Sequence, residues 1–163
     1  TPEDYYSIID GKTVGPFSTS CACAALVAGA TQEVADLLYE FGTEFGRAFQ
    51  LVDDLLDLTG DPSMGKPRGT DVHEGKMTLP LIHALTTLHG AEREHLADVL
   101  SNFSDDRWNE LHSLLEISDS MEYVKQLIQN HVDRALKILD TLPATPAREL
   151  MSEVALVSKK RRI

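Results

Sequence analysis

The stretch Phe49-Gln50-Leu51-Val52-Asp53-Asp54-Leu55-Leu56-Asp57 combines apolar and acidic residues at helical spacing. On a helix, positions 50, 53, 54 and 57 follow one another at i, i+3, i+4 and i+7, so their polar side chains form one stripe. The other positions of this stretch are apolar, which predicts a largely buried helix whose acids face a cavity or groove rather than open solvent. We predict that this helix runs from about residue 32 to residue 59 and stops at Gly60.

The position of the acids within this helix is electrostatically unfavourable. Asp53, Asp54 and Asp57 fall in its last two turns, where the macrodipole favours cations. Asp53 and Asp57 also repel each other at i, i+4. A bound divalent cation would relieve both penalties, and an all-oxygen ligand set suits Mg²⁺. The alternative is an acidic surface stripe with no ligand, because a DDxxD pattern is short and common.

The rest of the chain also has a helical pattern. No segment shows sustained alternation of β-branched and polar residues, so the sequence predicts an all-α helical bundle and a single unit over residues 1–163. Periodicity is absent from residues 61–77, and breaks are expected near Gly11 and Gly15. The other predicted helices cover residues 3–10, 13–28, 78 onward, 91–102, 104–117, 118–142 and 146 to the basic tail.

A glycine-rich segment with two lysines follows the acidic helix. Residues 60–66 match GxxxxGK, but Pro67 stands where a nucleotide-binding loop needs Ser or Thr, and a helix precedes the segment instead of a strand. We therefore reject a nucleotide loop. Lys66 and Lys76 beside the carboxylates suggest a metal-bound diphosphate, because lysine is a mobile charge suited to phosphate oxygens. The alternative is that these lysines only form surface ion pairs, with Asp61, Asp71 or Glu74.

Composition narrows the class of protein. The 163 residues are 42% hydrophobic and 25% charged, as in ordinary globular proteins, and the net charge of −11 argues against nucleic acid as a partner. No apolar run is long enough to cross a bilayer. Cys21 and Cys23 are two residues apart and point in different directions on a helix, so a disulfide between them is not expected, and we predict a reducing compartment, the cytoplasm. The chain starts at Thr1 without an initiator Met, so we expect a piece of a longer protein.

Several motifs together resemble the trans-isoprenyl diphosphate synthases, or polyprenyl synthetases. The segment from Tyr5 to Lys12-Thr13 is similar to the lysine-threonine segment of that family. The other matching motifs are Phe49-Gln50, Asp53-Asp54-x-x-Asp57, Gly65-Lys66-Pro67, Gly69-x-Asp71, Gly75-Lys76 and Thr78-Leu79-Pro80-Leu81. The resemblance implies the C-terminal portion of the isoprenoid synthase fold. It also implies an enzyme, a homodimer, that joins isopentenyl diphosphate to an allylic diphosphate.

The resemblance also implies a role for each matching residue. Asp53, Asp54 and Asp57 would form the second aspartate-rich motif, which binds Mg²⁺. Lys12, Lys66 and Lys76 would contact the allylic diphosphate. Thr13 and Gln50 would lie near the developing allylic cation, and Lys12 and these two residues are the candidate catalytic set.

The sequence departs from the family in one respect. The first aspartate-rich motif and the basic residues for isopentenyl diphosphate would lie upstream and are absent, so we expect this segment alone to be inactive. The run at residues 57–61, followed by Gly65-Lys66-Pro67, resembles medium- or long-chain polyprenyl synthases more than farnesyl ones, which implies a medium- or long-chain product. An alternative is a non-catalytic subunit of a heteromeric prenyl synthase. The basic tail at residues 159–162 is expected to be a solvated terminus, with weak contact to anionic lipid as the alternative.

Overall fold

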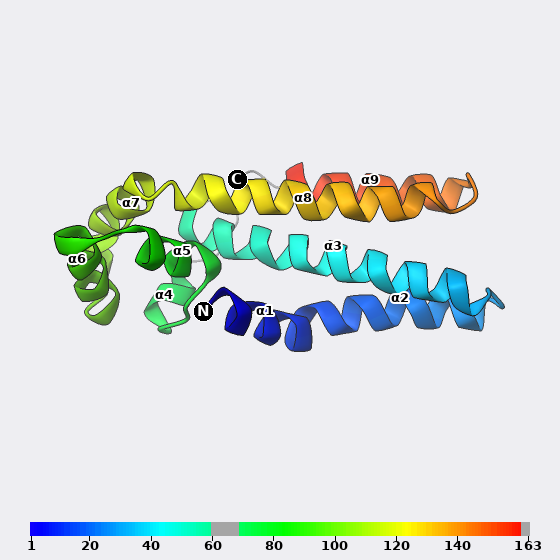
Figure 1. Ribbon diagram of the computed structural model, residues 1–163, viewed down its shortest axis with the longest axis horizontal. Coiled ribbons are helices and arrows are strands. Elements are labelled where there is room, and N and C mark those ends of the chain that lie inside the picture. The colour runs from blue at the N-terminus through cyan, green and yellow to red at the C-terminus, as the bar shows by residue number, and fades with distance from the viewer. Residues whose placement is uncertain (60–68, 161–163) are drawn as a thin grey trace. The chain divides into compact units, whose positions relative to one another are not determined.

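The computed structural model describes residues 1–59 and 69–160, apart from the side chains of residues 158–160. Within these ranges every regular element is helical and no strand occurs, which confirms the predicted all-α class (Figure 1). A π-helix, η1 (Asp10–Val14), joins α1 to α2, and a 3-10 helix, η3 (Asp105–Arg107), precedes α7. The α-helices are α1 (Pro2–Ile9), α2 (Gly15–Val27), α3 (Gln32–Thr59), α4 (Thr70–His73), α5 (Leu79–Thr87), α6 (Gly90–Ser101), α7 (Trp108–Ile117), α8 (Ser120–Asp140) and α9 (Pro146–Lys160).

The chain forms two compact units. The first unit comprises residues 1–5 and 53–125, and the second comprises residues 6–52 with residues from 126 onward. Helix α3 contributes residues to both units, because the division falls between Val52 and Asp53. The prediction of a single helical unit over residues 1–163 stays a prediction.

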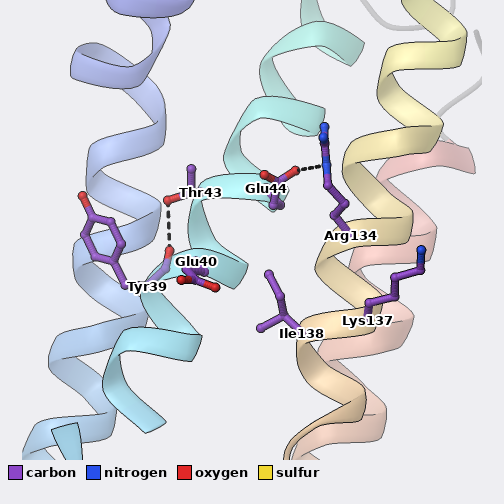
Figure 2. A pocket seen from close by; sticks show the side chains of 7 residues that line it. All are labelled: Tyr39, Glu40, Thr43, Glu44, Arg134, Lys137 and Ile138. Carbon is purple, nitrogen blue, oxygen red and sulfur yellow. Dashed lines mark hydrogen bonds and ion pairs between the residues drawn. The ribbon is translucent and has the colours of Figure 1, made fainter. Parts of the chain in front are cut away.

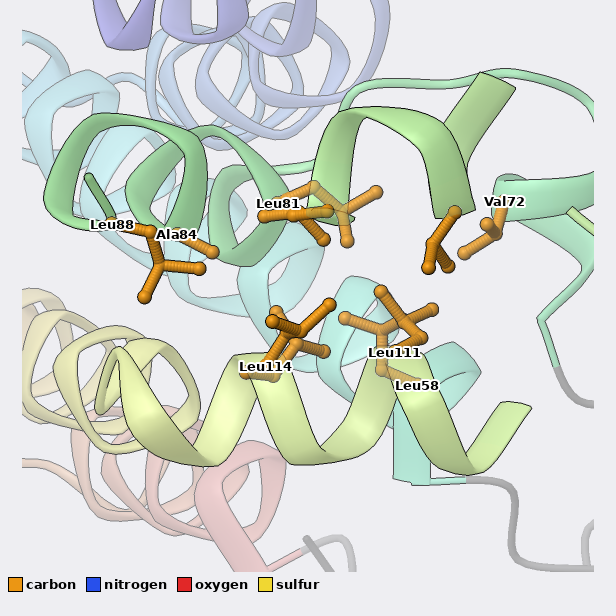
Figure 3. Close-up of a cluster of buried hydrophobic side chains, with 10 residues drawn as sticks. Leu58, Val72, Leu81, Ala84, Leu88, Leu111 and Leu114 are labelled. Carbon is orange, nitrogen blue, oxygen red and sulfur yellow. The ribbon is translucent and has the colours of Figure 1, made fainter. Parts of the chain in front are cut away.

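A cluster of buried apolar side chains forms the core of the first unit (Figure 3). Burial of apolar surface stabilises a fold by about 25 cal/mol per Å². Because Leu58 of α3 and Val72 of α4 belong to the same cluster, this burial holds the end of α3 and the short helix α4 in one core. The cluster consists of Leu58, Val72, Leu81, Ala84, Leu88, Leu96, Val99, Leu111, Leu114 and Leu115.

In the second unit, two glycines of α3 lie directly against the preceding helical segment. A Cβ atom at Gly42 would lie 2.6 Å from the Cα of Ser18, and one at Gly46 would lie 3.1 Å from the Cα of Val14. The hydroxyls of Ser18 and Thr43 lie 2.8 Å apart and form a hydrogen bond across the same contact. Glycine permits this close backbone approach because it has no side chain. Helix α3 is therefore packed tightly against α2 and η1.

Aromatic and aliphatic side chains complete the packing of the second unit. The ring of Phe17 meets Phe45 edge-on at 5.2 Å and lies 5.4 Å from the ring of Phe49. Edge-on and tilted pairs of this kind add to the stabilisation that area burial supplies. A further buried cluster joins α3, α8 and α9 through Phe41, Ala135, Leu139 and Ala155.

The backbone around Gly11 and Gly15 differs from the prediction. The sequence predicted a helix break there, whereas the chain stays helical and widens into the π-helix η1. The amide of Gly15 donates to the carbonyl oxygen of Asp10, five residues earlier. A Cβ atom at Gly15 would lie only 3.1 Å from that oxygen, so glycine fits the widened turn without crowding. The predicted break was wrong because glycine here accommodates one extra residue per turn.

Two other predicted segments need comment. Helix α4 lies within residues 61–77, for which no helix was predicted, and the side chains of the basic tail at 159–162 lie outside the described residues. Among the helices of residues 1–59 and 69–160, none has the length and apolar character needed to cross a membrane.

The tight contact at Gly42 can be tested by adding one methyl group. Gly42→Ala should lower the free energy of unfolding by about 1–3 kcal/mol, because the added methyl group would clash with the backbone of Phe17 and Ser18, which can shift only if α2 shifts with it. Gly11→Ala is the matched control, since nothing lies within 4 Å of its Cβ position, and it should be neutral or stabilising by up to about 1 kcal/mol. Equal effects of the two substitutions in urea unfolding would contradict the packing described.

Candidate functional site

The three aspartates of the α3 stripe, all in the first unit, have different environments. Asp54 is only 3% exposed, and its Oδ2 accepts a 2.6 Å hydrogen bond from the hydroxyl of buried Tyr5. Asp53 and Asp57 are partly exposed. A hydrogen bond from a neutral donor to a carboxylate stabilises the charged form. The stripe therefore offers two accessible carboxylates and one that is buried and oriented.

Asp57 holds the chain at the start of α4. Its carbonyl oxygen accepts the amide of Gly69 at 2.9 Å, and its carboxylate oxygens accept the amides of Thr70 and Asp71, each at 3.0 Å. A carboxylate at this place satisfies amides that no helical carbonyl can reach, and it complements the partial positive charge of a helix start. Asp57 thus has a structural role that the sequence did not predict.

Negative charge is crowded around Asp57. Burial raises the pKa of the Asp57 carboxyl, and the nearby carboxylates of Asp71 and Asp53 raise it further. The amides of Asp71 and Thr70 oppose this rise because they stabilise the charged form, yet the pKa remains above its ordinary value. Burial and the neighbouring carboxylates thus disfavour the charged form of Asp57, and a bound cation would favour it.

The lysines of the glycine-rich segment are only partly described. The ammonium of Lys76 lies 2.8 Å from Oδ1 of Asp71 and 2.6 Å from Oε2 of Glu74, and these acids raise the pKa of Lys76. These are the ion pairs that the alternative reading of the segment expected, although Lys76 remains about half exposed. Lys66, the other predicted diphosphate ligand, lies outside the described residues.

In the second unit, the structure brings two of the predicted residues together. The hydroxyl of Thr13 donates a 2.9 Å hydrogen bond to Oε1 of Gln50, which joins η1 to α3. Lys12 precedes Thr13 in η1, is exposed, and has no ion-pair partner among the described residues. Among the described residues, the π-helix therefore presents an ammonium without an ion-pair partner beside an ordered hydroxyl–amide pair.

The donor set can be compared with the needs of a metal ion. Within the described ranges, no group of three or more His, Cys, Asp or Glu side chains is arranged to hold a metal. Mg²⁺ does not need such a cage, because it typically uses one or two carboxylates and completes its octahedron with water and phosphate oxygens. Asp53 and Asp57 supply partly exposed carboxylates close enough to interact. These residues fit a hard divalent cation that binds together with a phosphate group.

The second unit also contains an open groove of about 520 Å³ between α3 and α8 (Figure 2). Acidic Glu40 and Glu44 line it together with basic Arg134 and Lys137, and the Nε of Arg134 donates to Glu44 at 2.8 Å. Charges of both signs in near balance give the groove no strong preference for an anion or a cation. None of the predicted site residues lines it.

Sequence comparison relates this site to a known family. The sequence profile of the family described as polyprenyl synthetase matches residues 1–117, well over half of the chain. The chain belongs to the polyprenyl synthetase family. This confirms the resemblance found in the motifs around residues 49–57.

Curated relatives and solved structures agree with this assignment. The octaprenyl diphosphate synthase of Escherichia coli K12 is 34% identical to the chain, over 99% of the chain and 50% of the relative. The heptaprenyl diphosphate synthase component 2 of Geobacillus stearothermophilus is 36% identical, over 96% of the chain and 49% of that relative. The crystal structure of a Caulobacter crescentus polyprenyl synthase, complexed with calcium and isoprenyl diphosphate, matches with a TM-score of 0.91 and 30% identity, over 100% of this chain and 51% of that one. The polyprenyl synthetase chain thus spans about half the length of these relatives.

Sequence reasoning missed two residues that act on the predicted site of this polyprenyl synthetase. Tyr5 orients Asp54, and Asp71 adds a third carboxylate beside Asp53 and Asp57. Asp71 stood in one of the quoted motifs, so its acidity close to a lysine was an available signal. Nothing in the sequence indicated the contact between Tyr5 and Asp54, because 49 residues separate them.

The structural role of Asp57 can be separated from any ligand role. Asp57→Ala removes the acceptor of the Thr70 and Asp71 amides, so we expect a loss of roughly 1–2 kcal/mol in unfolding free energy. Hydrogen exchange of these two amides should accelerate. Asp105→Ala removes an exposed acid paired with His73 and should change stability by less than about 0.5 kcal/mol. Unchanged exchange at residues 70 and 71 would contradict the role given to Asp57.

Asp71→Asn should lower the pKa of Asp57, because it removes a like charge and keeps the amide of residue 71 as a donor. With a raised pKa, folded Asp57 binds its proton more tightly than the unfolded chain does. Its contribution to stability therefore falls as the pH rises from the ordinary carboxyl pKa through the raised value. Titration of the carboxyl ¹³C shift measures the pKa, with Asp106→Asn as control. An unchanged pKa in the Asp71 variant would show that charge crowding is not its cause.

Proposed function

We propose that the full-length protein is a trans-prenyltransferase that condenses isopentenyl diphosphate with an allylic diphosphate. Family membership supports the reaction class, and several relatives are named as octaprenyl, heptaprenyl or nonaprenyl diphosphate synthases. The observation that carries the proposal is the proximity of Asp53, Asp57 and Asp71, because burial and the negative charge of the other two carboxylates raise the pKa of Asp57. This charge suits the cation-assisted departure of a diphosphate.

In the proposed reaction, the C–O bond of the allylic diphosphate breaks and pyrophosphate leaves with the bonding electrons. The double bond of isopentenyl diphosphate attacks the allylic cation, and loss of a proton forms the new double bond. The departing group carries a large negative charge, so preorganised positive groups give the main stabilisation of the transition state.

Asp53, Asp54 and Asp57 are the proposed ligands of Mg²⁺. When bound, the metal neutralises charge on the pyrophosphate. Asp53 and Asp57 have the more accessible carboxylates, and Asp54 is oriented by the 2.6 Å hydrogen bond from Tyr5. The amides of Thr70 and Asp71 donate to the two carboxylate oxygens of Asp57 and fix its orientation, as hydrogen bonds to ligating carboxylates do in metal sites.

Lys12, Lys66 and Lys76 are the proposed ligands of the allylic diphosphate. Lys12 has the best support, because it is exposed and has no ion-pair partner among the described residues. Lys76 would exchange its ion pairs with Asp71 and Glu74 for phosphate oxygens, which exposed pairs allow at small cost. Lys66 enters the proposal through the family resemblance alone.

Thr13 and Gln50 are proposed to face the allylic cation. The side-chain oxygen of Gln50 carries the negative end of the amide dipole, which stabilises a nearby positive carbon without attacking it. The hydroxyl of Thr13 donates to this oxygen at 2.9 Å and so fixes the orientation of the amide. An oriented dipole needs no reorganisation when charge develops.

We further propose a medium- or long-chain product, magnesium as the metal, and a cytoplasmic homodimer. Because the chain spans about half the length of its relatives, we propose that this segment alone is inactive. One relative is named as component 2 of a heptaprenyl diphosphate synthase, which supports a heteromeric assembly. A non-catalytic subunit of such an enzyme is therefore the second candidate function.

Binding and turnover test the proposal in the full-length protein. Mg²⁺ with inorganic diphosphate should raise the melting temperature more than either does alone, because each neutralises the other in the site. Asp53→Ala should abolish this shift and lower prenyl transfer by roughly 100-fold or more. Asp105→Ala, an exposed acid of the first unit, should keep both properties.

The outcomes separate the candidates. No shift with Mg²⁺ and diphosphate would contradict the proposed site and favour an acidic stripe without a ligand. A shift without prenyl transfer would favour the non-catalytic subunit. Near-normal turnover of Asp53→Ala would remove that residue from the mechanism.

A further inference from the structure

Side chains of α3 contact the π-helix η1 near both of its ends. It spans Asp10–Val14, carries Lys12 and Thr13, and is closed by the amide of Gly15 on the carbonyl of Asp10. Such single π-turns are rare and occur often at functional sites.

Arg47 of α3 binds the side chain of Asp10, the first residue of the turn. Its Nε donates to Oδ1 of Asp10 at 2.9 Å, and its terminal nitrogen donates to Oδ2 at 2.6 Å. The two side chains are 28% and 35% exposed, so water screens the pair only in part. Two parallel hydrogen bonds from a planar guanidinium fix the orientation of the Asp10 carboxylate as well as its distance from Arg47. The hydrogen bonds to Asp10 also raise the pKa of Arg47.

Other contacts hold Arg47 itself. Its guanidinium carbon lies 5.5 Å from the ring centroid of Tyr6, one turn before Asp10, in a cation–π arrangement. The Tyr6 hydroxyl lies 3.4 Å from Nε2 of His131, whose Nδ1 lies 2.7 Å from Glu44. Arg47 is thus part of a network that reaches α1, α3 and α8 within the second unit, and it is not a loose surface side chain.

The other end of the turn is held from the same face of α3. Gln50, one turn after Arg47, accepts the hydrogen bond of Thr13 at 2.9 Å. Gly46, beside Arg47, lets the backbone of Val14 approach closely. Lys12 therefore lies between two residues that α3 holds in place, Asp10 and Thr13, while its own ammonium has no ion-pair partner within residues 1–59 and 69–157.

We propose that Arg47 is a positioning residue for the allylic diphosphate: through Asp10 it locks the π-turn so that Lys12 and Thr13 face the substrate in one arrangement. This inference rests on the proposed function, which gives Lys12 and Thr13 their ligands. Arg47 touches neither substrate nor metal in it.

Substrate-specific kinetics of the full-length enzyme test the proposal. Arg47→Gln should lower kcat/KM for the allylic diphosphate by roughly 10- to 100-fold, because a small displacement of Lys12 and Thr13 misaligns the ionising bond. The KM for isopentenyl diphosphate should not change. Arg47→Lys keeps the positive charge but loses the two parallel hydrogen bonds of the guanidinium, so its kcat/KM should lie between those of wild type and Arg47→Gln. The kcat/KM of Asp10→Asn combined with Arg47→Gln should be no lower than that of either single variant.

Arg107→Gln is the matched control for simple loss of stability. Arg107 also binds two carboxylates, those of Asp98 and Glu110, and its side chain is 21% exposed. This variant should keep KM for both substrates. If Arg47→Gln and Arg107→Gln have the same kinetic constants per folded molecule, Arg47 has no positioning role and the proposal is overturned.

Hydrogen exchange without substrate distinguishes failure of this inference from failure of the proposed function. The Gly15 amide should exchange faster in Arg47→Gln than in wild type or Arg107→Gln, because the turn it closes is released. Unchanged exchange at Gly15 overturns the inference whatever the activity. Faster exchange in a protein whose Lys12→Ala variant retains full prenyl transfer would instead contradict the proposed function.

Discussion

Negative charge at the C-terminal end of α3 is the constraint around which the first unit is organised. Asp53 and Asp57 lie in the last turns of this helix, where the helix dipole already disfavours anions. Asp71 adds a third carboxylate, while Lys76 pairs with Asp71 and the amides at the start of α4 bind Asp57. Burial, together with the negative charge of Asp71 and Asp53, raises the pKa of Asp57. The same negative charge accounts for the affinity that we propose for a divalent cation with a diphosphate.

Apolar packing holds these carboxylates in place against their mutual repulsion. Leu58, next to Asp57, belongs to the buried cluster that includes Val72 of α4. The ring of Trp108 covers Gly69 so closely that a Cβ atom there would lie 2.5 Å from it. Asp57 completes the arrangement with hydrogen bonds to three successive amides. The same residue therefore contributes charge to the site and order to the segment beside it.

The second unit is organised by close helix packing. Glycines at positions 42 and 46 bring α3 against α2 and η1, and this short distance lets Arg47 and Gln50 reach the π-turn from one face. A bulkier residue at either glycine would separate the helices and lengthen both contacts. The geometry of Lys12 and Thr13 thus depends on small residues that carry no chemistry of their own.

The sequence by itself determined the all-α class, most helix boundaries, and the grouping of Asp53 and Asp57, because helical periodicity and charge pattern are local properties. It could not reveal that Tyr5 binds Asp54, that Asp57 caps α4, or that residues 10–14 widen into a π-turn instead of breaking. Those features join residues distant in the chain, or depend on how closely two helices approach. Only tertiary packing sets such distances, since the free energy of many buried side chains together decides them.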